Sequence, residues 1–170
     1  MRHAAVLCLL ALVSAACSGE QTVFEGGPRF PDDEGVVTSI SLERMQIEGD
    51  RNYVIGRDVE SFKTRSHEPA SLLSLKDKYV QVGLDGDEVG WIALVGIVVG
   101  DDSPTVLYTG VFDGVDGRTD RAVFADGTTL ALADDIDVPE EGQEVAAAID
   151  ARSHTVTSLQ VATLRTTPTP

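Results

Sequence analysis

The chain has 170 residues, a net charge of −15 and aromatic residues at only 5%. This acidity argues against nucleic-acid binding, because a negative surface repels phosphate backbones, and the length allows one folded domain or two small ones. The charge is uneven, since the segment from Asp85 to Glu144 holds fifteen acidic residues against Arg118 and Arg121 alone. The simplest interpretation of this acidic half is a solvated surface that keeps the protein soluble.

The first 16 residues have the order of an export signal. Arg2 gives a short positive start, and an uncharged, mostly apolar run of 13 residues follows from Ala4 to Ala16. A membrane-spanning helix needs roughly 20 apolar residues, so this run is too short for a stable anchor. Together with the small residues at its end, it predicts a signal peptide over residues 1–16 that is removed on export.

Cys17 follows the signal directly. The other cysteine, Cys8, lies in the segment that would be removed, so Cys17 has no partner for an intramolecular disulfide. A lone cysteine in an exported chain calls for an explanation. The leader resembles the bacterial lipoprotein signal, which implies cleavage between Ala16 and Cys17 and attachment of acyl chains such as palmitate to Cys17. The alternative is an ordinary secretory signal cleaved nearby, with Cys17 incidental.

Residues 17–34 contain glycines, prolines and acidic residues without apolar periodicity. This composition predicts a flexible tether after the lipidated cysteine, and residues 166–170 are predicted to be a disordered tail. An acyl anchor would then hold a folded part on the extracytoplasmic side of a bacterial cell membrane or envelope.

From residue 35 onward, short runs of Val, Ile and Thr lie between Gly and Asp turns, which favours strands over helices. A hairpin is predicted at Glu48-Gly49, residues 57–75 read as an insertion, and a short helical turn is expected within Pro69–Lys78. The strands predicted for this first unit, residues 35–100, are Gly35–Ile40, Met45–Ile47, Tyr53–Ile55, Val80–Asp85 and Val89–Val99.

A similar order recurs in a second unit, residues 105–165, with a hairpin at Asp126-Gly127. The predicted strands are Gly110–Val115, Val123–Ala125, Leu130–Leu132, Val145–Asp150 and His154–Ala162. Alternation places Val80, Val82 and Leu84 on one face of their strand, and Val145, Ala147 and Ile149 on one face of theirs. We interpret the two units as a duplication; the alternative is two unrelated β-meanders.

Five short strands per unit predict a small closed or nearly closed barrel, which protects strand edges. The opening glycine, the acidic-Gly hairpin and the run Gly142-Gln143-Glu144-Val145 before a late strand resemble OB-like β-barrel domains of unknown function, often repeated in exported bacterial proteins. The resemblance covers Gly35 to about Thr163, although Asp77 replaces the glycine in the first unit. It implies an all-β fold of two tandem, about five-stranded, OB-like barrels, and it implies no activity.

The segment from Trp91 to Val99 is apolar on both faces. We therefore expect one face to cover its own core and the other, including Ile97 or Val98, to contact the second unit or an outside partner. Trp91 is the candidate interaction residue, because exposed aromatic side chains anchor interfaces; its alternative role is in the core.

Candidate catalytic and metal-binding residues are sparse. The mature chain has two histidines, His67 and His154, and neither lies in a nucleophile motif, so both are interpreted as ordinary surface residues. The acidic loops at 85–88, 113–120 and 134–137 carry oxygen ligands that suit calcium. Their spacing does not match the twelve-residue calcium loop, and acidic hairpin turns are the simpler interpretation.

The sequence thus predicts a non-enzymatic binding or interaction module, held at a membrane by a lipid, with no cofactor or metal and with an envelope protein as its partner. A calcium- or cation-responsive envelope protein is the alternative. An envelope hydrolase is the second alternative, and it lacks candidate residues.

Overall fold

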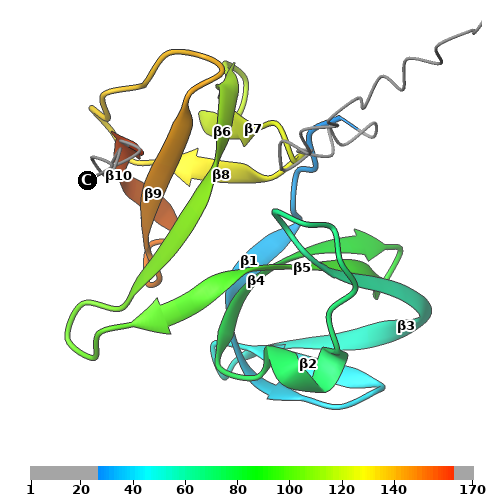
Figure 1. Cartoon of the computed structure of the whole chain (residues 1–170). Coiled ribbons are helices and arrows are strands. Elements are labelled where there is room, and N and C mark those ends of the chain that lie inside the picture. The colour runs from blue at the N-terminus through cyan, green and yellow to red at the C-terminus, as the bar shows by residue number, and fades with distance from the viewer. Residues whose placement is uncertain (1–26, 163–170) are drawn as a thin grey trace, which may run out of the picture.

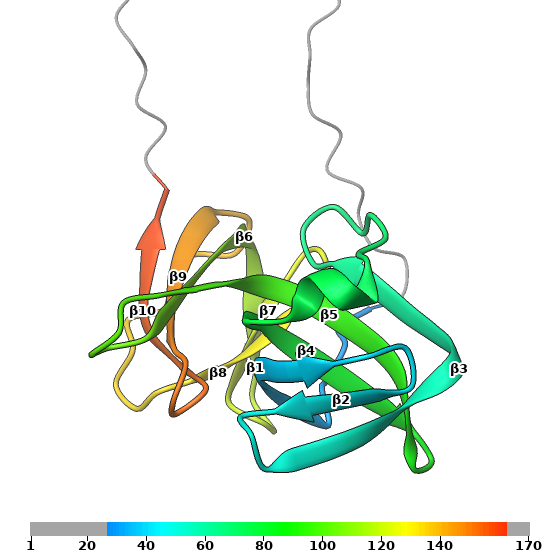
Figure 2. The same ribbon diagram turned by 90° about the horizontal axis from the view of Figure 1, so that it is seen from below.

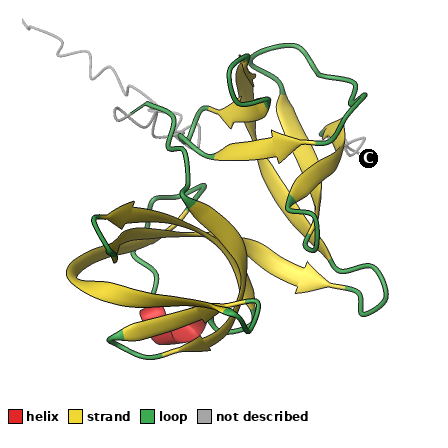
Figure 3. Ribbon diagram, turned by 180° about the vertical axis from the view of Figure 1, so that it is seen from behind, coloured by secondary structure: helices red, strands yellow, loops and turns green. Residues whose placement is uncertain are grey.

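The computed structural model describes residues 27–162, and this part of the chain is all-β, as predicted (Figure 1). It contains ten strands and a single turn of 3-10 helix, and Figure 3 shows how strands dominate it. Among the described residues, no helix has the length and apolar character needed to cross a membrane.

The first five strands form what we call the first strand group. β1 pairs antiparallel with β2 and β4, β2 pairs with β3, and β4 pairs with β5, whereas β3 and β5 pair in parallel. Each strand of the group therefore has two neighbours within it. The elements are β1 (Asp33–Ile40), β2 (Arg44–Ile47), β3 (Arg51–Lys63), η1 (Leu72–Leu75), β4 (Lys78–Asp85) and β5 (Glu88–Val99).

The second strand group repeats this pattern of pairing. β6 pairs with β7 and β9, β7 with β8, and β9 with β10, all antiparallel, while β8 and β10 are parallel. β5 also pairs with β6, so that all ten strands are linked in one sheet. We call these two paired strands the β5–β6 ribbon, and Figure 2 shows that it connects the two groups. The elements are β6 (Thr105–Asp116), β7 (Arg121–Phe124), β8 (Thr129–Leu132), β9 (Glu144–Asp150) and β10 (Thr155–Val161).

The repetition extends to single hydrogen bonds before β4 and β9. Asp77 N donates to Val37 O at 2.8 Å, and Gly142 N donates to Phe112 O at 2.7 Å. Both donors have a left-handed backbone, with φ of 61° at Asp77 and 83° at Gly142. Aspartate tolerates this conformation better than most side chains, so Asp77 makes the turn that the resemblance assigns to glycine.

Two predicted strands extend further than their sequence patterns indicate. β3 continues from the predicted end at Ile55 to Lys63, because Glu60–Lys63 pairs with Trp91–Leu94 of β5. Seven of the 19 residues of the predicted insertion, 57–63, are therefore strand, and η1 supplies the expected helical turn. β6 begins at Thr105, where β5 and β9 both offer hydrogen-bonding partners.

The predicted alternation holds in β9 and fails at the end of β4. Val145, Ala147 and Ile149 are all buried, whereas Leu84 is 39% exposed although Val80 and Val82 are fully buried. The pairing of β4 with β5 shifts register between Gly83 and Leu84. The unpaired residue is Gly90 of β5, and Leu84 lies beyond this irregularity at the end of β4, outside the core.

Two clusters of buried side chains underlie the fold. One lies within the first strand group and includes Val37, Ile47 and Ile92. The other lies within the second group but also contains Tyr79 and Val95 from the first group. The two groups therefore pack against each other through apolar side chains.

This packing tests the prediction for the apolar strand, which is confirmed in part. Val95 is buried in the second cluster and Val98 packs against it. Ile97 is instead 59% exposed, so it does not pack against the second unit, and contact with an outside partner stays a prediction for this side chain. Val98 pairs with Val106, and alternation turns Ile97 to the other side of the β5–β6 ribbon.

Candidate interaction site between the two strand groups

Of the predicted site residues, Ala16 and Cys17 lie outside the described part of the chain, so signal cleavage and lipid attachment stay predictions. Trp91 is described and lies on β5, half-buried. Its indole rests on β4 over Gly83, where an added Cβ would come within 1.8 Å of Trp91 Nε1. The glycine therefore leaves the space that the indole fills.

Trp91 belongs to an aromatic surface outside the two core clusters. Its ring lies 6.4 Å from that of Phe62, tilted by 33°, and Phe62 in turn stacks on His67 at 5.6 Å. Phe62 and Trp91 come from β3 and β5, which pair in parallel. This pairing brings together two aromatic residues that are 29 positions apart in the sequence.

Arg29 lies over this aromatic surface. Its guanidinium carbon is 4.5 Å from the Phe62 ring centre and 5.8 Å from that of Trp91, both within the range of cation–π attraction. Its Nη1 also lies 4.0 Å from the Glu60 carboxylate. The segment just before β1 is thus attached to the outer face of the first strand group.

The same segment is attached to the second strand group through its backbone. Arg29 N donates to Gly127 O at 2.8 Å, and Thr129 Oγ1 donates to Arg29 O, also at 2.8 Å. Arg29 therefore binds one group with its side chain and the other with its main chain.

A small open hollow, with free space for about one water molecule, lies where these contacts meet. One wall comes from β3, β4 and β5 and the other from the β7–β8 turn, so the hollow lies at the junction of the two groups. Its lining residues are Arg29, Phe62, Thr64, Gln81, Trp91, Ala93, Asp126, Gly127 and Thr128. We call it the junction hollow.

Polar groups behind the hollow join the two strand groups. The Glu34 carboxylate accepts from Gln81 Nε2 at 2.9 Å and from Arg121 Nη2 at 3.0 Å. Gln81 Nε2 and Arg121 Nη2 also donate to the carbonyl of Thr129, at 2.6 and 2.9 Å. The Glu34 and Arg121 side chains are only 11% and 14% exposed. A buried ion pair with these extra hydrogen bonds costs several kcal/mol to break, so it holds the walls of the hollow in place.

The β7–β8 turn is held from both sides. His67 Nε2 lies 2.8 Å from Asp126 O, and a carbonyl only accepts, so this nitrogen carries the proton. Tyr108 donates its hydroxyl to Asp126 Oδ2 at 2.7 Å. Burial, and next the negative charge of Asp126, raise the pKa of the Tyr108 hydroxyl, which therefore stays a donor at neutral pH.

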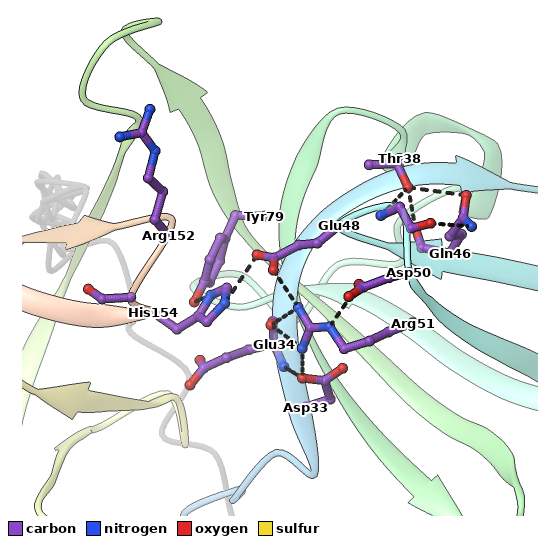
Figure 4. A network of polar contacts seen from close by, with 12 residues as sticks. Asp33, Glu34, Thr38, Gln46, Glu48, Asp50, Arg51, Tyr79, Arg152 and His154 are labelled. Carbon is purple, nitrogen blue, oxygen red and sulfur yellow. Dashed lines mark hydrogen bonds and ion pairs between the residues drawn. The ribbon is translucent and has the colours of Figure 1, made fainter.

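A second polar network crosses the junction at His154 (Figure 4). His154 Nε2 lies 3.1 Å from Glu48 Oε1, and its Nδ1 lies 3.2 Å from the Tyr79 hydroxyl. Glu48 also pairs with Arg51 at 3.0 Å, and Arg51 pairs with Asp33. A carboxylate only accepts, so Nε2 carries a proton and donates it to Glu48.

Tyrosine hydroxyls in this network are poor proton donors to solution. Burial raises the pKa of Tyr79. Burial and the hydrogen bond to Asp33 raise the pKa of Tyr53 to about 12. The Tyr79 hydroxyl beside His154 is therefore a hydrogen-bond donor and a weak nucleophile at neutral pH.

The histidine positions differ from the sequence interpretation. His67 and His154 were expected at ordinary surface positions, yet both are half-buried and each contacts the opposite strand group. Both also have a left-handed backbone, with φ of 51° and 59°. Each lies in a turn whose partner is more than 50 residues away in the sequence, which local patterns do not reveal.

The acidic loops behave as turns in the described part of the chain. Within residues 27–162, no three acidic, cysteine or histidine side chains gather in a way that could hold a metal ion. Asp116 instead accepts a hydrogen bond from the backbone of Thr119 in its own turn. Outside these loops, Asp150 at the end of β9 accepts from the backbone of Arg152 and Ser153, which lowers the pKa of its carboxyl.

An apolar strip lies on the opposite side of the β5–β6 ribbon. Ile97, Val99 and Leu107 are each at least half exposed there. Neither the junction hollow nor this strip could be identified from the sequence, because both depend on which side of the ribbon faces the second cluster.

No protein-family model matches this chain, and no curated protein or solved structure shows a significant match to it.

Proposed function

We propose that this chain is a lipid-anchored protein on the extracytoplasmic side of a bacterial membrane or envelope, where it acts as a non-catalytic module that binds an envelope protein. The anchoring rests on the leader, in which Cys17 directly follows small residues and has no disulfide partner in the mature chain. The described part begins at residue 27, so about ten residues would separate the lipid from the fold.

The observation that carries the binding role is the junction hollow. It combines two aromatic side chains, Phe62 and Trp91, with polar groups from both strand groups. Binding sites are concave and mix apolar walls with a few oriented polar groups. The buried ion pair between Glu34 and Arg121 lies behind the hollow and keeps it preformed.

We further propose that each strand group is a small OB-like barrel, the first over residues 35–100 and the second over residues 105–165. The support is that each strand pairs with two neighbours of its own group, and that the third and fifth strands pair in parallel. Such closure leaves few free strand edges. β1 begins at Asp33, slightly before the boundary predicted from the sequence.

Lipid attachment is tested by labelling cells with a fatty acid analogue that carries a click handle. The native chain should take up the label and fractionate with membranes, whereas Cys17→Ala should remain unlabelled and leave the membrane fraction. Equal labelling of the two chains would refute acylation at Cys17.

The binding role is tested by cross-linking in intact cells followed by affinity purification. Trp91→Ala removes one wall of the hollow, and Leu42→Ala is the matched control, since Leu42 is 70% exposed and lies away from the hollow. We expect a specific partner with the native chain and with Leu42→Ala, and loss of it with Trp91→Ala. Capture that does not depend on Trp91 would exclude the hollow as the binding site.

A further inference from the structure

Arg29 forms part of the wall of the junction hollow, and it packs on Phe62 and Trp91 in the way that a bound peptide would. Its side chain fills the space over Phe62 and Trp91, and its backbone makes one hydrogen bond with each of Gly127 and Thr129. Peptide recognition commonly works in this manner, with main-chain hydrogen bonds giving affinity and a side-chain pocket giving specificity.

The chemistry of the hollow favours a planar cation. Phe62 and Trp91 present aromatic faces, which attract a guanidinium more effectively than a compact ammonium group because the planar cation also stacks. Two carboxylates lie close by: Asp126 lines the hollow, and Glu60 lies beside Arg29 at its rim. The chain carries a net charge of −15, which further favours a basic partner.

The position of Arg29 in the chain makes it an internal competitor. Residues 27–31, with the sequence Gly-Pro-Arg-Phe-Pro, lie just before β1 and belong to the predicted tether of residues 17–34. A short connection to the fold keeps such a segment at an effective concentration of about 1 mM or more. An external segment must therefore displace it before binding.

We propose that the surface under Arg29, made by Phe62, Trp91 and the β7–β8 turn, recognises an arginine side chain presented on an extended segment of a partner protein, and that residues 27–31 occupy this site until the partner displaces them. The inference rests on the proposed binding function and names its ligand. Displacement would also release residues 27–31, so partner binding and release of this part of the tether from the fold are coupled.

Trp91 allows a direct measurement, because it is the only tryptophan of the chain. The probe is the capped peptide Gly-Pro-Arg-Phe-Pro, titrated into the full mature chain carrying Arg29→Ala while tryptophan emission is recorded. We expect a saturable change in emission. The capped peptide Gly-Pro-Ala-Phe-Pro should bind roughly tenfold more weakly, as expected for the loss of one cation–π contact.

The native chain tests the competition. In the native chain, the concentration of arginine peptide that gives half of the emission change should be roughly tenfold higher than in Arg29→Ala, because residues 27–31 of the native chain compete with the peptide. Arg118→Ala is the matched control, since it removes an exposed arginine that does not line the hollow, and it should behave like the native chain. Equal midpoints for the native chain and Arg29→Ala would overturn the competition.

A second variant guards against misfolding of Arg29→Ala. Arg29→Lys keeps the charge but not the planar guanidinium, so its midpoint should fall between those of the native chain and Arg29→Ala. If neither variant responds to the arginine peptide more than to the alanine peptide, the arginine proposal is wrong. If partner capture still depends on Trp91 in that case, the binding function stands without the arginine proposal. If the peptide preference and the Trp91-dependent capture are both absent, the arginine proposal and the binding function are both refuted.

Discussion

Replacement of Gly83 by alanine should displace the indole of Trp91. An alanine Cβ at this position would lie 1.8 Å from Nε1, 2.1 Å from Cε2 and 2.7 Å from Cδ1. Non-bonded carbon atoms prefer separations of about 3.5–4.0 Å, so the ring must move by roughly 1.5–2 Å. Overpacking of this kind costs about 1–3 kcal/mol, and the displaced indole also loses its contact with Phe62.

The assay is urea denaturation followed by far-UV circular dichroism, applied to Gly83→Ala, Trp91→Ala and the double variant. The methyl group has room once the indole is removed, so Gly83→Ala should cost little in the Trp91→Ala background. The coupling free energy should therefore be about 1–3 kcal/mol. Gly117→Ala is the control, since nothing lies within 4 Å of an added Cβ there.

Additive effects of the two substitutions would refute this reasoning, because they would show that the indole does not lie over Gly83. An unchanged unfolding midpoint for Gly83→Ala would have the same meaning. A shift in the emission maximum of Gly83→Ala, absent in Gly117→Ala, would support the displacement independently of stability.

The remaining predictions concern the junction and the buried hydroxyls. Val95→Asp should lower the free energy of unfolding by about 3 kcal/mol or more, because it buries a charge. Ile97→Asp, at an exposed position, should change it by no more than about 0.5 kcal/mol. Similar losses for the two variants in urea denaturation would contradict the assignment of Val95 to the buried face and Ile97 to the exposed face. Arg121→Met leaves a buried carboxylate without its cation and should cost about 3–5 kcal/mol; a loss under 1 kcal/mol would show that the pair is not buried. Burial raises the pKa of Tyr79 and Tyr108 above the unfolded value near 10, so stability is retained below pH 10 and falls above it by about 1.4 kcal/mol per pH unit for each tyrosine. Tyrosinate absorbance should then rise together with unfolding, and reversible ionisation near pH 10 with the circular dichroism unchanged would argue against this burial.

Local patterns predict the strands that need only local information. The alternation of Val145, Ala147 and Ile149 indicates a half-buried strand, and the structure buries all three. The turn at Glu48-Gly49 requires positive φ angles, and both residues have them, at 54° and 85°. Steric limits on the backbone and the two-residue period of a strand act within a few residues, so the sequence alone reveals them.

Features that depend on distant partners are not visible in those patterns. The second half of β3 is strand because β5 lies beside it. Leu84 lies outside the core, beyond an irregularity in the pairing of β4 with β5. Arg29 reads as part of a flexible tether, yet its cation lies on aromatic rings from β3 and β5. In each case the deciding contact involves a residue more than 30 positions away or a shift in strand pairing.

The sequence by itself determined the all-β class, the positions of most strands and turns, and the apolar character of Trp91–Val99. Only the tertiary structure decided that Val95 is buried and Ile97 exposed, that both histidines bridge the strand groups, and that Arg29 covers Trp91. The physical reason is that hydrogen-bonding period and turn strain are local properties of the chain. The side of a ribbon that becomes buried is set by the packing of one strand group against the other.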